Sequence, residues 1–377
     1  MKIVVNTRLL LPNKLEGMGW FMYETLKRIT KTHPEHHFVF LFDRHFDEAF
    51  IFSDNVTPVI LTPPARHPIL FYIWFEYSVA NFLKKYKPDL FLSPDGYLSL
   101  KATCKQLAVI HDINFEHYPK DLSFIVHKYL TCFFPKFARK ATRIATVSEY
   151  SKNDIASTYN IDPRKIDVVY NGSNPLYTPI SDVLKAETKK RFSGGEDYFL
   201  FVGSLHPRKN IARLFKAFDA FKIKQNNPTK LVIVGKKYYW TGEIQEAHTN
   251  MQFKADVIFT DRLSTEGLKL VLGAALAMTY VPYFEGFGIP ILEAMNCDVP
   301  VITSNVTSMP EVAQDAALLV DPFSVDAIAD ALHKIYSDKD LRTQLIEKGR
   351  IRKLDFSWDK TAEALWESMA KTIGRWV

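Results

Sequence analysis

The chain has 377 residues, of which 47% are hydrophobic and 24% charged. This composition excludes a disordered chain, a collagen-like repeat and a small disulfide-rich scaffold, and the length predicts two domains, or at most three. The formal net charge of +6 is compatible with an anionic ligand or a membrane surface and does not require nucleic acid. Three widely spaced cysteines, Cys104, Cys132 and Cys297, indicate a reducing compartment.

Hydrophobic runs in the chain are short. The apolar run near the N-terminus is too short for the core of a signal peptide, and no stretch of 18 apolar residues predicts a transmembrane helix. The most apolar segment, residues 69–83, contains Glu76 and is followed by Lys84 and Lys85. It favours a core helix, with a helix on a membrane surface as the alternative. We therefore expect a cytoplasmic protein, with peripheral contact at the inner face of the plasma membrane left open.

Strand and helix patterns alternate along the first half of the chain. A helix after the first strand is predicted by apolar residues at three- and four-residue steps, from Met18 to Ile29. Ser148 is a candidate N-cap for a helix that begins near Glu149. The expected strands are residues 3–6, 38–42, 90–93, 107–110, 144–147 and 168–170. Their continuous apolar character is typical of parallel strands that are covered on both faces.

The second half repeats this alternation after a turn-rich cluster at residues 171–175. Helices are predicted at residues 211–221 and 324–336. The expected strands are residues 198–202, 231–234, 257–260, 278–281 and 299–303. The pattern predicts an α/β protein with two doubly wound parallel-sheet, Rossmann-like domains that face each other across a cleft. Ligands in such sheets bind at the carboxyl ends of the strands, so the cleft is the expected site.

Two carboxylates bracket a glycine-containing loop in the segment Glu285-Gly286-Phe287-Gly288-Ile289-Pro290-Ile291-Leu292-Glu293. Pro290 is suited to the first position of a helix, and a helix start offers backbone N–H groups and partial positive charge to an anion. Glu285 and Glu293 could accept hydrogen bonds from the hydroxyl groups of a ribose and a hexose. The alternative is an ordinary turn followed by a helix with a solvated glutamate.

A second segment, Gly203-Ser204-Leu205-His206-Pro207-Arg208-Lys209-Asn210, also lies between a strand and a helix. Arg208 offers a planar fork to phosphate oxygens and Lys209 a compact charge, which suits a diphosphate. Asn210 is a candidate helix cap. The alternative is an exposed basic turn.

Two weaker signals follow strands in the first half. Gly17-Met18-Gly19 is not a dinucleotide-binding fingerprint, but its glycines would let the backbone approach a phosphate or a sugar. His111-Asp112 comes directly after the strand at 107–110, where an imidazole could contact a reacting sugar. A lone histidine of this kind is more often structural.

In order and spacing, these motifs resemble retaining glycosyltransferases of family 4, which have the GT-B fold. The resemblance also includes residues 147–151, 170–172 and 310–312, and it extends over nearly the whole chain. Residues 74–76 further resemble bacterial members that build surface polysaccharides with mannose. One departure is Trp20, where relatives often carry Arg, and this puts the acceptor-side contacts in doubt.

The resemblance implies an acceptor-side domain at residues 1–175, a nucleotide-sugar donor domain at 176–359 and a final helix, about Lys360 to Trp376, that returns to the first domain. It implies that Arg208 and Lys209 hold the donor diphosphate and that Glu293 binds the ribose. It assigns the transferred sugar to Glu285 and the backbone of residues 286–289. The remaining contacts that it implies are His111 near the reacting carbon, Gly17 and Gly19 near the phosphates, and Leu263 with residues 260–262 against the base. Asp112 and Gly203 are further expected substrate-binding residues.

Breaking the bond between sugar and diphosphate places negative charge on the phosphate, so fixed cations there are the largest expected catalytic effect. Arg208, Lys209 and a helix start could supply it, and the donor half has no Asp-x-Asp after a strand, so we expect no metal and no cofactor. Asp338-Lys339-Asp340 is interpreted as a helix start. Retention often involves a carboxylate nucleophile, but the family resemblance implies same-face attack, with the leaving phosphate accepting the proton. Glu285 is therefore not assigned as nucleophile or base.

We expect GDP-mannose as the donor, with a UDP-hexose as the second candidate, and a glycan or lipid-linked oligosaccharide as the acceptor. Three other functions are alternatives. A nucleotide-sugar epimerase would need no acceptor, a nicotinamide enzyme is disfavoured by the missing glycine fingerprint, and a silent nucleotide-sugar binder is disfavoured by the intact charged motifs.

Overall fold

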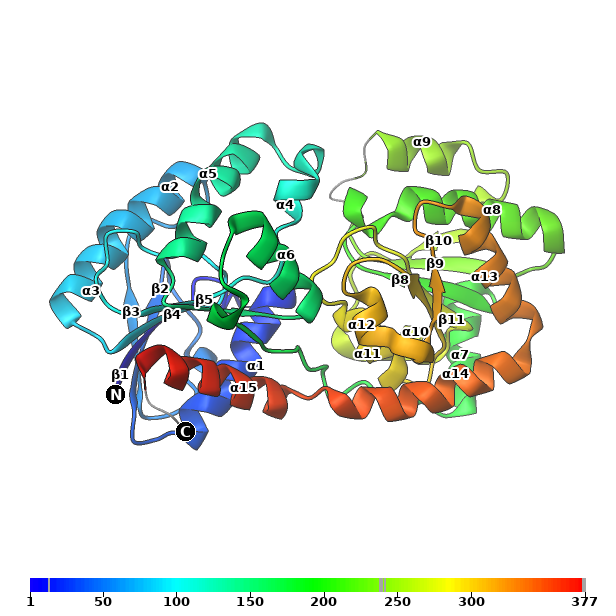
Figure 1. Cartoon of the computed structure of the whole chain (residues 1–377). Helices are drawn as coiled ribbons and strands as arrows, with labels where there is room; N and C mark the ends of the chain where they lie inside the picture. Colours follow the sequence, from blue (N-terminus) through cyan, green and yellow to red (C-terminus); the bar gives the residue numbers. More distant parts are fainter. Residues whose placement is uncertain (13, 237–239, 241, 375–377) are drawn as a thin grey trace. The chain divides into compact units, whose positions relative to one another are not determined.

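The computed structural model describes residues 1–12, 14–236, 240 and 242–374. The chain divides into two units: unit 1 is Met1–Gly172 with Ser357–Val377, and unit 2 is Ser173–Phe356. In each unit the described residues contain one sheet in which every strand pairing is parallel (Figure 1). The predicted fold class, an α/β protein with two doubly wound sheets, is confirmed.

In unit 1 the described residues form a seven-stranded sheet in the order β3-β2-β1-β4-β5-β6-β7. The strands are β1 (Lys2–Asn6), β2 (His37–Phe42), β3 (Val56–Ile60), β4 (Leu90–Ser93), β5 (Gln106–Val109), β6 (Arg143–Thr146) and β7 (Ile166–Val168). The strand order reverses at β1 and β4, which are neighbours. The carboxyl ends of these two strands are therefore the expected ligand-binding edge of unit 1.

Helices of unit 1 connect and cover these strands. They are α1 (Gly17–Thr32), α2 (Pro68–Ile73), α3 (Ala80–Tyr86), α4 (Asn114–His117), α5 (Phe124–Lys140), α6 (Glu149–Tyr159) and α15 (Trp358–Ile373). Ser148 caps α6, because its hydroxyl accepts a hydrogen bond from the Ser151 N–H, as predicted. The C-terminal helix α15 packs against α1 and against β4, β5 and β6. The predicted end of this helix, Trp376, lies outside the described residues.

The apolar segment at 69–83 is not one regular helix. A π-helical stretch, Trp74–Val79, joins α2 to α3 and changes the directions in which the following side chains point. Trp74 and Phe75 are buried, and Glu76 is buried as well, where it accepts hydrogen bonds from the backbone N–H groups of Leu100 and Lys101. The prediction that this segment packs in the core is therefore confirmed for the face that carries Trp74, Phe75 and Glu76.

In unit 2 the described residues form a six-stranded sheet in the order β10-β9-β8-β11-β12-β13. The strands are β8 (Tyr198–Val202), β9 (Lys230–Val234), β10 (Val257–Phe259), β11 (Ala277–Tyr280), β12 (Val301–Ser304) and β13 (Leu318–Val320). The helices are α7 (Asp182–Ser193), α8 (Ile211–Gln225), α9 (Glu243–Thr249), α10 (Thr265–Gly273), α11 (Ile289–Asn296), α12 (Met309–Ala313), α13 (Val325–Ser337) and α14 (Lys339–Arg352). The strand order reverses between β8 and β11, which pair directly.

Most predicted elements of unit 2 lie within a residue or two of the observed ones. Asp338 lies at the start of α14 as predicted and caps it, because its carboxylate accepts a hydrogen bond from the Leu341 N–H. Asn210 occupies the N-cap position of α8, but its side chain does not cap the helix, which corrects the prediction. The Asn210 amide instead donates to the carbonyl groups of Val281 and Pro322 and ties three loops together.

Three strands depart from the sequence prediction. The strand expected at residues 168–170 lies at β7, two residues earlier, and β3 and β13 were not predicted. β3 contains Pro58 and occupies the edge of its sheet, where a missing N–H is tolerated. β13 has only three residues. In the part of the chain that the structure describes, we find no helix that combines the length and apolar character needed to span a membrane.

Candidate active site

The polar loops of unit 2 meet where the strand order reverses. Gly203 follows β8, and a short 3-10 turn, Pro207–Lys209, leads from that loop into α8. Glu285 lies in the loop that follows β11. The two loops are joined by a hydrogen bond from the Tyr283 N–H to the Arg208 carbonyl, 3.0 Å long. The pairing of β8 with β11 thus brings together two motifs that are far apart in the sequence.

Arg208 and Lys209 both form ion pairs with the same oxygen of Glu285. The three side chains are only 24%, 12% and 10% exposed. Burial by itself would raise the pKa of Glu285, but the adjacent charges of Arg208 and Lys209 outweigh it and lower the pKa to about 2. Glu285 is therefore ionised at neutral pH, and two cations against one carboxylate leave the cluster with net positive charge.

Tyr280 extends this cluster to the end of β11. The Lys209 ammonium group donates to the Tyr280 hydroxyl, 2.5 Å away. Burial, followed by the negative charge of Glu285, raises the pKa of the fully buried Tyr280, so its phenol stays neutral. Tyr280 was not identified in the sequence analysis, because its position within an apolar strand carried no chemical signal.

The loop at residues 286–288 turns sharply into α11. Gly288 has a φ of +99°, and a Cβ placed on it would lie 2.8 Å from Cε of Met309. The backbone conformation therefore favours glycine, and a side chain here would also displace the end of Met309. Ser308 holds the loop from the other side, because its hydroxyl donates to the Glu285 carbonyl at 2.8 Å. At the start of α11, Pro290 has no N–H and the Ile291 N–H donates to the Gly288 carbonyl at 3.0 Å, so the helix start offers the Ile289 N–H to an anion or to sugar oxygens.

Helix α11 begins at Ile289, so Pro290 is its second residue and not its first. Phe287 is buried and packs edge-on against Phe356, with ring centroids 5.6 Å apart. The backbone of Phe287, Gly288 and Ile289 is thus fixed between a buried ring and a helix start. Gly286, also buried, connects this segment to Glu285.

Glu293 lies one turn into α11. Burial raises the pKa of its carboxyl to about 7. Among the described residues, no hydrogen bond or ion pair to this carboxylate is present. The buried Tyr177 lies near it, since Glu293 contributes to the raised pKa of Tyr177. Near neutral pH, an unpaired and partly protonated carboxyl can accept or donate a hydrogen bond to a ligand hydroxyl.

Gly203 and Leu263 lie along the same carboxyl edge of the sheet. The Gly203 N–H donates to the Val234 carbonyl, which ties the end of β8 to β9. A Cβ on Gly235 would lie 1.8 Å from the Gly203 carbonyl oxygen, so this contact requires glycine at position 235, which the sequence analysis missed. Leu263 follows β10 and is partly exposed. Since β9 lies between β8 and β10, Leu263 is separated along this edge from Arg208 and Glu285.

In unit 1, His111 follows β5 and contacts the first helix. Its Nε2 lies 2.9 Å from the Pro94 carbonyl, so this nitrogen carries the proton, and its ring packs edge-on against Phe21 of α1 at 5.0 Å. Burial lowers the pKa of His111, so the ring is neutral at neutral pH. Its Nδ1 is then the nitrogen that can accept a hydrogen bond. The Asp112 carboxylate accepts from the Asn114 N–H at 3.2 Å, at the start of α4.

Gly17 and Gly19 lie in the first turn of α1. A Cβ on Gly17 would meet nothing within 4 Å, so the space beside the Gly17 backbone is open. A Cβ on Gly19 would lie 3.2 Å from the Leu9 carbonyl and from a methyl group of Leu15, so Gly19 lets the preceding loop approach the helix.

A buried polar network, also missed by the sequence analysis, holds this edge of unit 1. Arg8 pairs with Asp95 at 2.6 Å, and Asn6 donates to the same carboxylate at 2.9 Å. The Arg8 guanidinium lies over the rings of Phe71 and Tyr97, at 4.8 and 4.6 Å from their centroids. The network joins the carboxyl ends of β1 and β4 under the loop that leads to α1. The signal was available, since Asn6-Thr7-Arg8 is a polar triplet that begins at the last residue of a buried strand.

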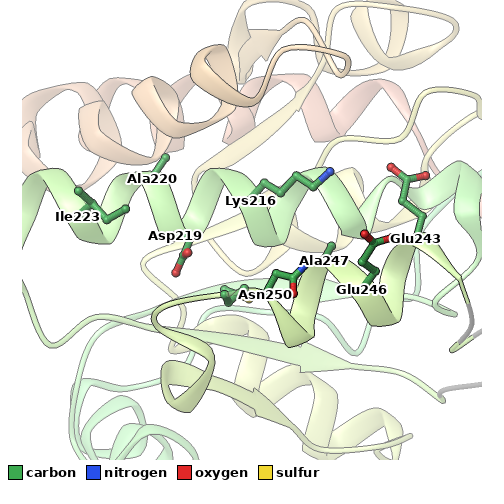
Figure 2. Close-up of a pocket in the computed structure, with 9 residues that line it drawn as sticks. Lys216, Asp219, Ala220, Ile223, Glu243, Glu246, Ala247 and Asn250 are labelled. Carbon is green, nitrogen blue, oxygen red and sulfur yellow. The ribbon is translucent and has the colours of Figure 1, made fainter.

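A separate groove lies between α8 and α9 in unit 2, away from these residues (Figure 2). It is lined by Lys216, Asp219, Ala220, Ile223, Glu243, Glu246, Ala247, Asn250 and Met251. The Asp219 carboxylate already accepts hydrogen bonds from the N–H groups of Gln252 and Phe253. None of the predicted site residues lines this groove.

Comparison with known proteins identifies the class. Residues 183–352 match the model of glycosyl transferases group 1, and residues 15–175 match that of glycosyltransferase family 4. Together the two models cover most of the chain, and each falls largely within one of the two units. The chain belongs to glycosyltransferase family 4 and is a glycosyltransferase with the GT-B fold.

Relatives and solved structures agree with this assignment. O-antigen chain mannosyltransferase B of Escherichia coli is 28% identical over 282 residues, 74% of this chain and 73% of the relative. O-antigen chain mannosyltransferase RfbU of Salmonella typhimurium is 27% identical over 310 residues, 82% and 79% of the two chains. In fold, the chain is similar to WaaG, a glycosyltransferase involved in lipopolysaccharide biosynthesis, with a TM-score of 0.74, 16% identity and coverage of 97% and 98%. Sucrose-phosphate synthase from Thermosynechococcus elongatus gives a TM-score of 0.76 at 18% identity, with 99% of both chains covered.

Proposed function

We propose that this glycosyltransferase transfers a hexose, mannose in the first instance, from a nucleoside diphosphate sugar to a glycan or lipid-linked glycan, with retention of anomeric configuration and without a metal. The observation that carries the proposal is the buried cluster of Arg208, Lys209 and Glu285 beside the start of α11. Mannose and a surface-polysaccharide acceptor are supported by the names of the two bacterial relatives, which are O-antigen mannosyltransferases.

In this proposal Arg208 and Lys209 bind the diphosphate. Their net positive charge, held in place by Glu285 and Tyr280, is present before the reaction and needs no reorganisation when charge develops on the leaving group. Gly203, at the end of β8, leaves room for the phosphates on the same edge. Gly17 and Gly19 in unit 1 are proposed to approach the phosphates with their backbone.

The other donor contacts are assigned by the chemistry of each group. Glu293, an unpaired carboxyl at the carboxyl edge of the sheet, is proposed to bind the ribose hydroxyls. Glu285 and the backbone of residues 286–289 are proposed to bind the hydroxyls of the transferred sugar. The partly exposed side chain of Leu263 is proposed to pack against the base.

In the proposed reaction one bond breaks and one bond forms at the anomeric carbon. The anomeric C–O bond to the diphosphate breaks, and the acceptor oxygen bonds to the same face of that carbon. The proton of the acceptor hydroxyl passes to an oxygen of the leaving phosphate. His111, whose neutral ring offers Nδ1 as an acceptor, is proposed to bind a hydroxyl of the sugar near the reacting carbon.

In this scheme Glu285 is assigned neither as the nucleophile nor as a proton donor. Its carboxylate pairs with two cations, and its pKa of about 2 keeps it deprotonated throughout the neutral range. A group of this kind holds cations and accepts hydrogen bonds, but it does not donate a proton to a leaving group.

The acceptor side is proposed to include peripheral contact with a membrane, because unit 1 exposes apolar and basic side chains on neighbouring helices. Phe124 and Ile125 at the start of α5 are 76% and 58% exposed, and Ile69 of α2, which packs on α5, is 65% exposed. Exposed basic residues accompany them on the same segments. These are Lys84 and Lys85 in the last turn of α3, Lys87 at its C-cap, and Lys128, Lys136, Arg139 and Lys140 on α5.

Vesicle sedimentation tests this contact. Replacing Phe124 and Ile125 by Ser should reduce the fraction bound to vesicles that contain anionic lipid. Val183→Ser, which alters an equally exposed apolar residue of unit 2, is the control and should bind as the unmodified chain does. Equal binding of all three proteins would refute the contact.

The donor is tested by thermal melting with GDP-mannose, GDP-glucose, UDP-glucose and UDP-galactose. A donor at 100 times its dissociation constant adds about 2.7 kcal/mol to the free energy of unfolding, so the true donor raises the melting temperature clearly. A UDP-hexose is the second candidate, since the GT-B protein HepE of Anabaena, with a TM-score of 0.75, was solved with UDP and glucose. A chain that responds to none of these donors and consumes none of them would contradict the proposed function.

A further inference from the structure

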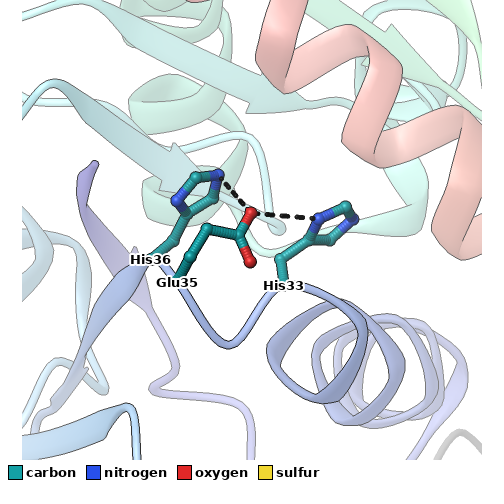
Figure 3. Close-up of side chains that lie close together, drawn as sticks. All are labelled: His33, Glu35 and His36. Atoms are coloured by element: carbon teal, nitrogen blue, oxygen red, sulfur yellow. Dashed lines mark ion pairs between the residues drawn. The ribbon is translucent and has the colours of Figure 1, made fainter.

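Three side chains with metal-binding atoms lie together in the turn between α1 and β2 of unit 1 (Figure 3). They are His33 at the end of α1, Glu35 in the turn and His36 directly before β2. One nitrogen of each ring and a carboxylate oxygen of Glu35 all lie within 4.8 Å of one another. Elsewhere in the described part of the chain, no other group of three such residues meets this criterion.

The distances suit a tetrahedral ion. Nδ1 of His33 lies 3.8 Å and Nε2 of His36 lies 3.2 Å from Oε1 of Glu35. Zinc binds nitrogen and carboxylate oxygen at about 2.0–2.2 Å, so two ligand atoms in a tetrahedron lie about 3.3 Å apart. The observed separations lie on either side of this value, and a small rotation of the exposed Glu35 side chain would equalise them.

The turn that carries these residues is held in place by its neighbours. The Asn55 side-chain amide donates to the backbone carbonyls of Thr30, His33 and His36, at 3.0, 3.1 and 3.0 Å. Trp366 of α15 stacks on His33, with ring centroids 3.6 Å apart and planes 17° from parallel. A fixed backbone and a fixed ring reduce the conformational entropy that ligand binding would cost.

One side of the cluster is open to solvent. Glu35 is 60% exposed and lies toward solvent, which gives an ion access. The amino group of Met1 lies 3.3 Å from Nδ1 of His36. The other ring nitrogen of His36, Nε2, faces Glu35. A positive charge on this amine opposes a bound cation.

We propose that His33, Glu35 and His36 bind a Zn²⁺ ion through Nδ1, the carboxylate and Nε2, with a fourth position open to water. Two imidazoles and one carboxylate are borderline ligands, which zinc accepts and Mg²⁺ and Ca²⁺ do not prefer. The turn lies at the amino end of β2, whereas Gly17 and His111 lie at the carboxyl edge of the same sheet. The ion therefore joins the end of α1 to the start of β2 and takes no part in sugar transfer.

The experiment uses the full chain without a histidine tag, stripped of metal with EDTA and desalted into buffer at about pH 8. Zn²⁺ is titrated against a chromophoric chelator, and Trp366 reports binding through tryptophan fluorescence. We expect one Zn²⁺ per chain, a higher melting temperature and a fluorescence change. His36→Ala and Glu35→Gln should weaken binding at least about tenfold.

His37→Ala is the matched control, because His37 is the next residue, is exposed and lies outside the cluster. It should bind Zn²⁺ as the unmodified chain does. Glu35→Gln keeps the test informative if a histidine variant fails to fold, since Glu35 is largely exposed. The proposal is overturned if the unmodified chain binds no Zn²⁺, or if Glu35→Gln binds it with unchanged affinity and unchanged fluorescence response.

Discussion

Arg208 and Glu285 are 77 residues apart in the chain, and their side chains form an ion pair at the carboxyl edge of one sheet. They meet because β8 and β11, which are not consecutive strands, pair at the point where the strand order reverses. Lys209 shares the same carboxylate oxygen, so one anion positions two cations. The preorganised positive charge of the donor unit thus depends on the order of strands in its sheet.

Replacing Arg208 by Ala should lower kcat by about 10²–10³, equivalent to about 2.7–4 kcal/mol of transition-state stabilisation, because a fixed donor to the leaving group is lost. The fold should be little affected, since Lys209 still pairs with Glu285. Initial rates and thermal melting of the same preparation measure both effects. Lys216→Ala, an exposed lysine on α8, is the control. An Arg208→Ala enzyme that keeps its full rate would exclude the proposed role.

Glu293→Gln should become more stable relative to the unmodified chain as the pH rises. The pKa of Glu293 is raised to about 7 in the folded chain, whereas an unfolded glutamate titrates near 4.5. The folded state therefore binds the extra proton between these values, and the unmodified chain loses stability as pH rises from about 4.5 to 7. Gln has no such proton to lose.

Chemical denaturation of both proteins at pH 5.5 and pH 8 measures this difference. The gain of Glu293→Gln over the unmodified chain should be larger at pH 8. A difference that does not change with pH would show that Glu293 titrates normally. In the same pH range, the KM for the donor should show a transition near pH 7 that is absent in Glu293→Gln.

Removal of metal should affect the thermal stability of the chain but not its rate of sugar transfer. Because Arg208, Lys209 and the start of α11 supply the positive charge, EDTA should leave the transfer rate unchanged. It should lower the melting temperature if Zn²⁺ is bound at His33, Glu35 and His36. Rates and melting curves before and after EDTA, and after added Mn²⁺, test both statements. Lost activity that Mn²⁺ restores would contradict the metal-free reaction.

Gly288→Ala should destabilise unit 2 by about 1–3 kcal/mol, because a residue with a Cβ is strained at a φ of +99° and its Cβ would meet Met309. Thermal and urea unfolding measure the loss. Gly17→Ala provides the contrast, since its Cβ would meet nothing within 4 Å and its stability should be unchanged. If Gly288→Ala is as stable as Gly17→Ala, the loop before α11 is less constrained than its geometry indicates.

The local pattern of the sequence determined much of this fold. Residues 90–93 and 198–202 were predicted as strands and form β4 and β8 with the same bounds, because a continuous apolar run between turn residues permits little else. Ser148 and Asp338 were recognised as helix starts, since capping depends on residues within one turn of each other. The order of the charged motifs was also sufficient to indicate the family.

Only the tertiary structure decided which of these groups meet and how they ionise. The sequence suggested that Glu285 and Glu293 have similar chemistry, but two paired cations lower the pKa of one and burial raises that of the other. The edge position that tolerates Pro58 in β3, and the pairing of Arg8 with Asp95, likewise depend on strand order. Strand order, burial and ion pairing arise from contacts between segments distant in the chain, and no local pattern contains that information.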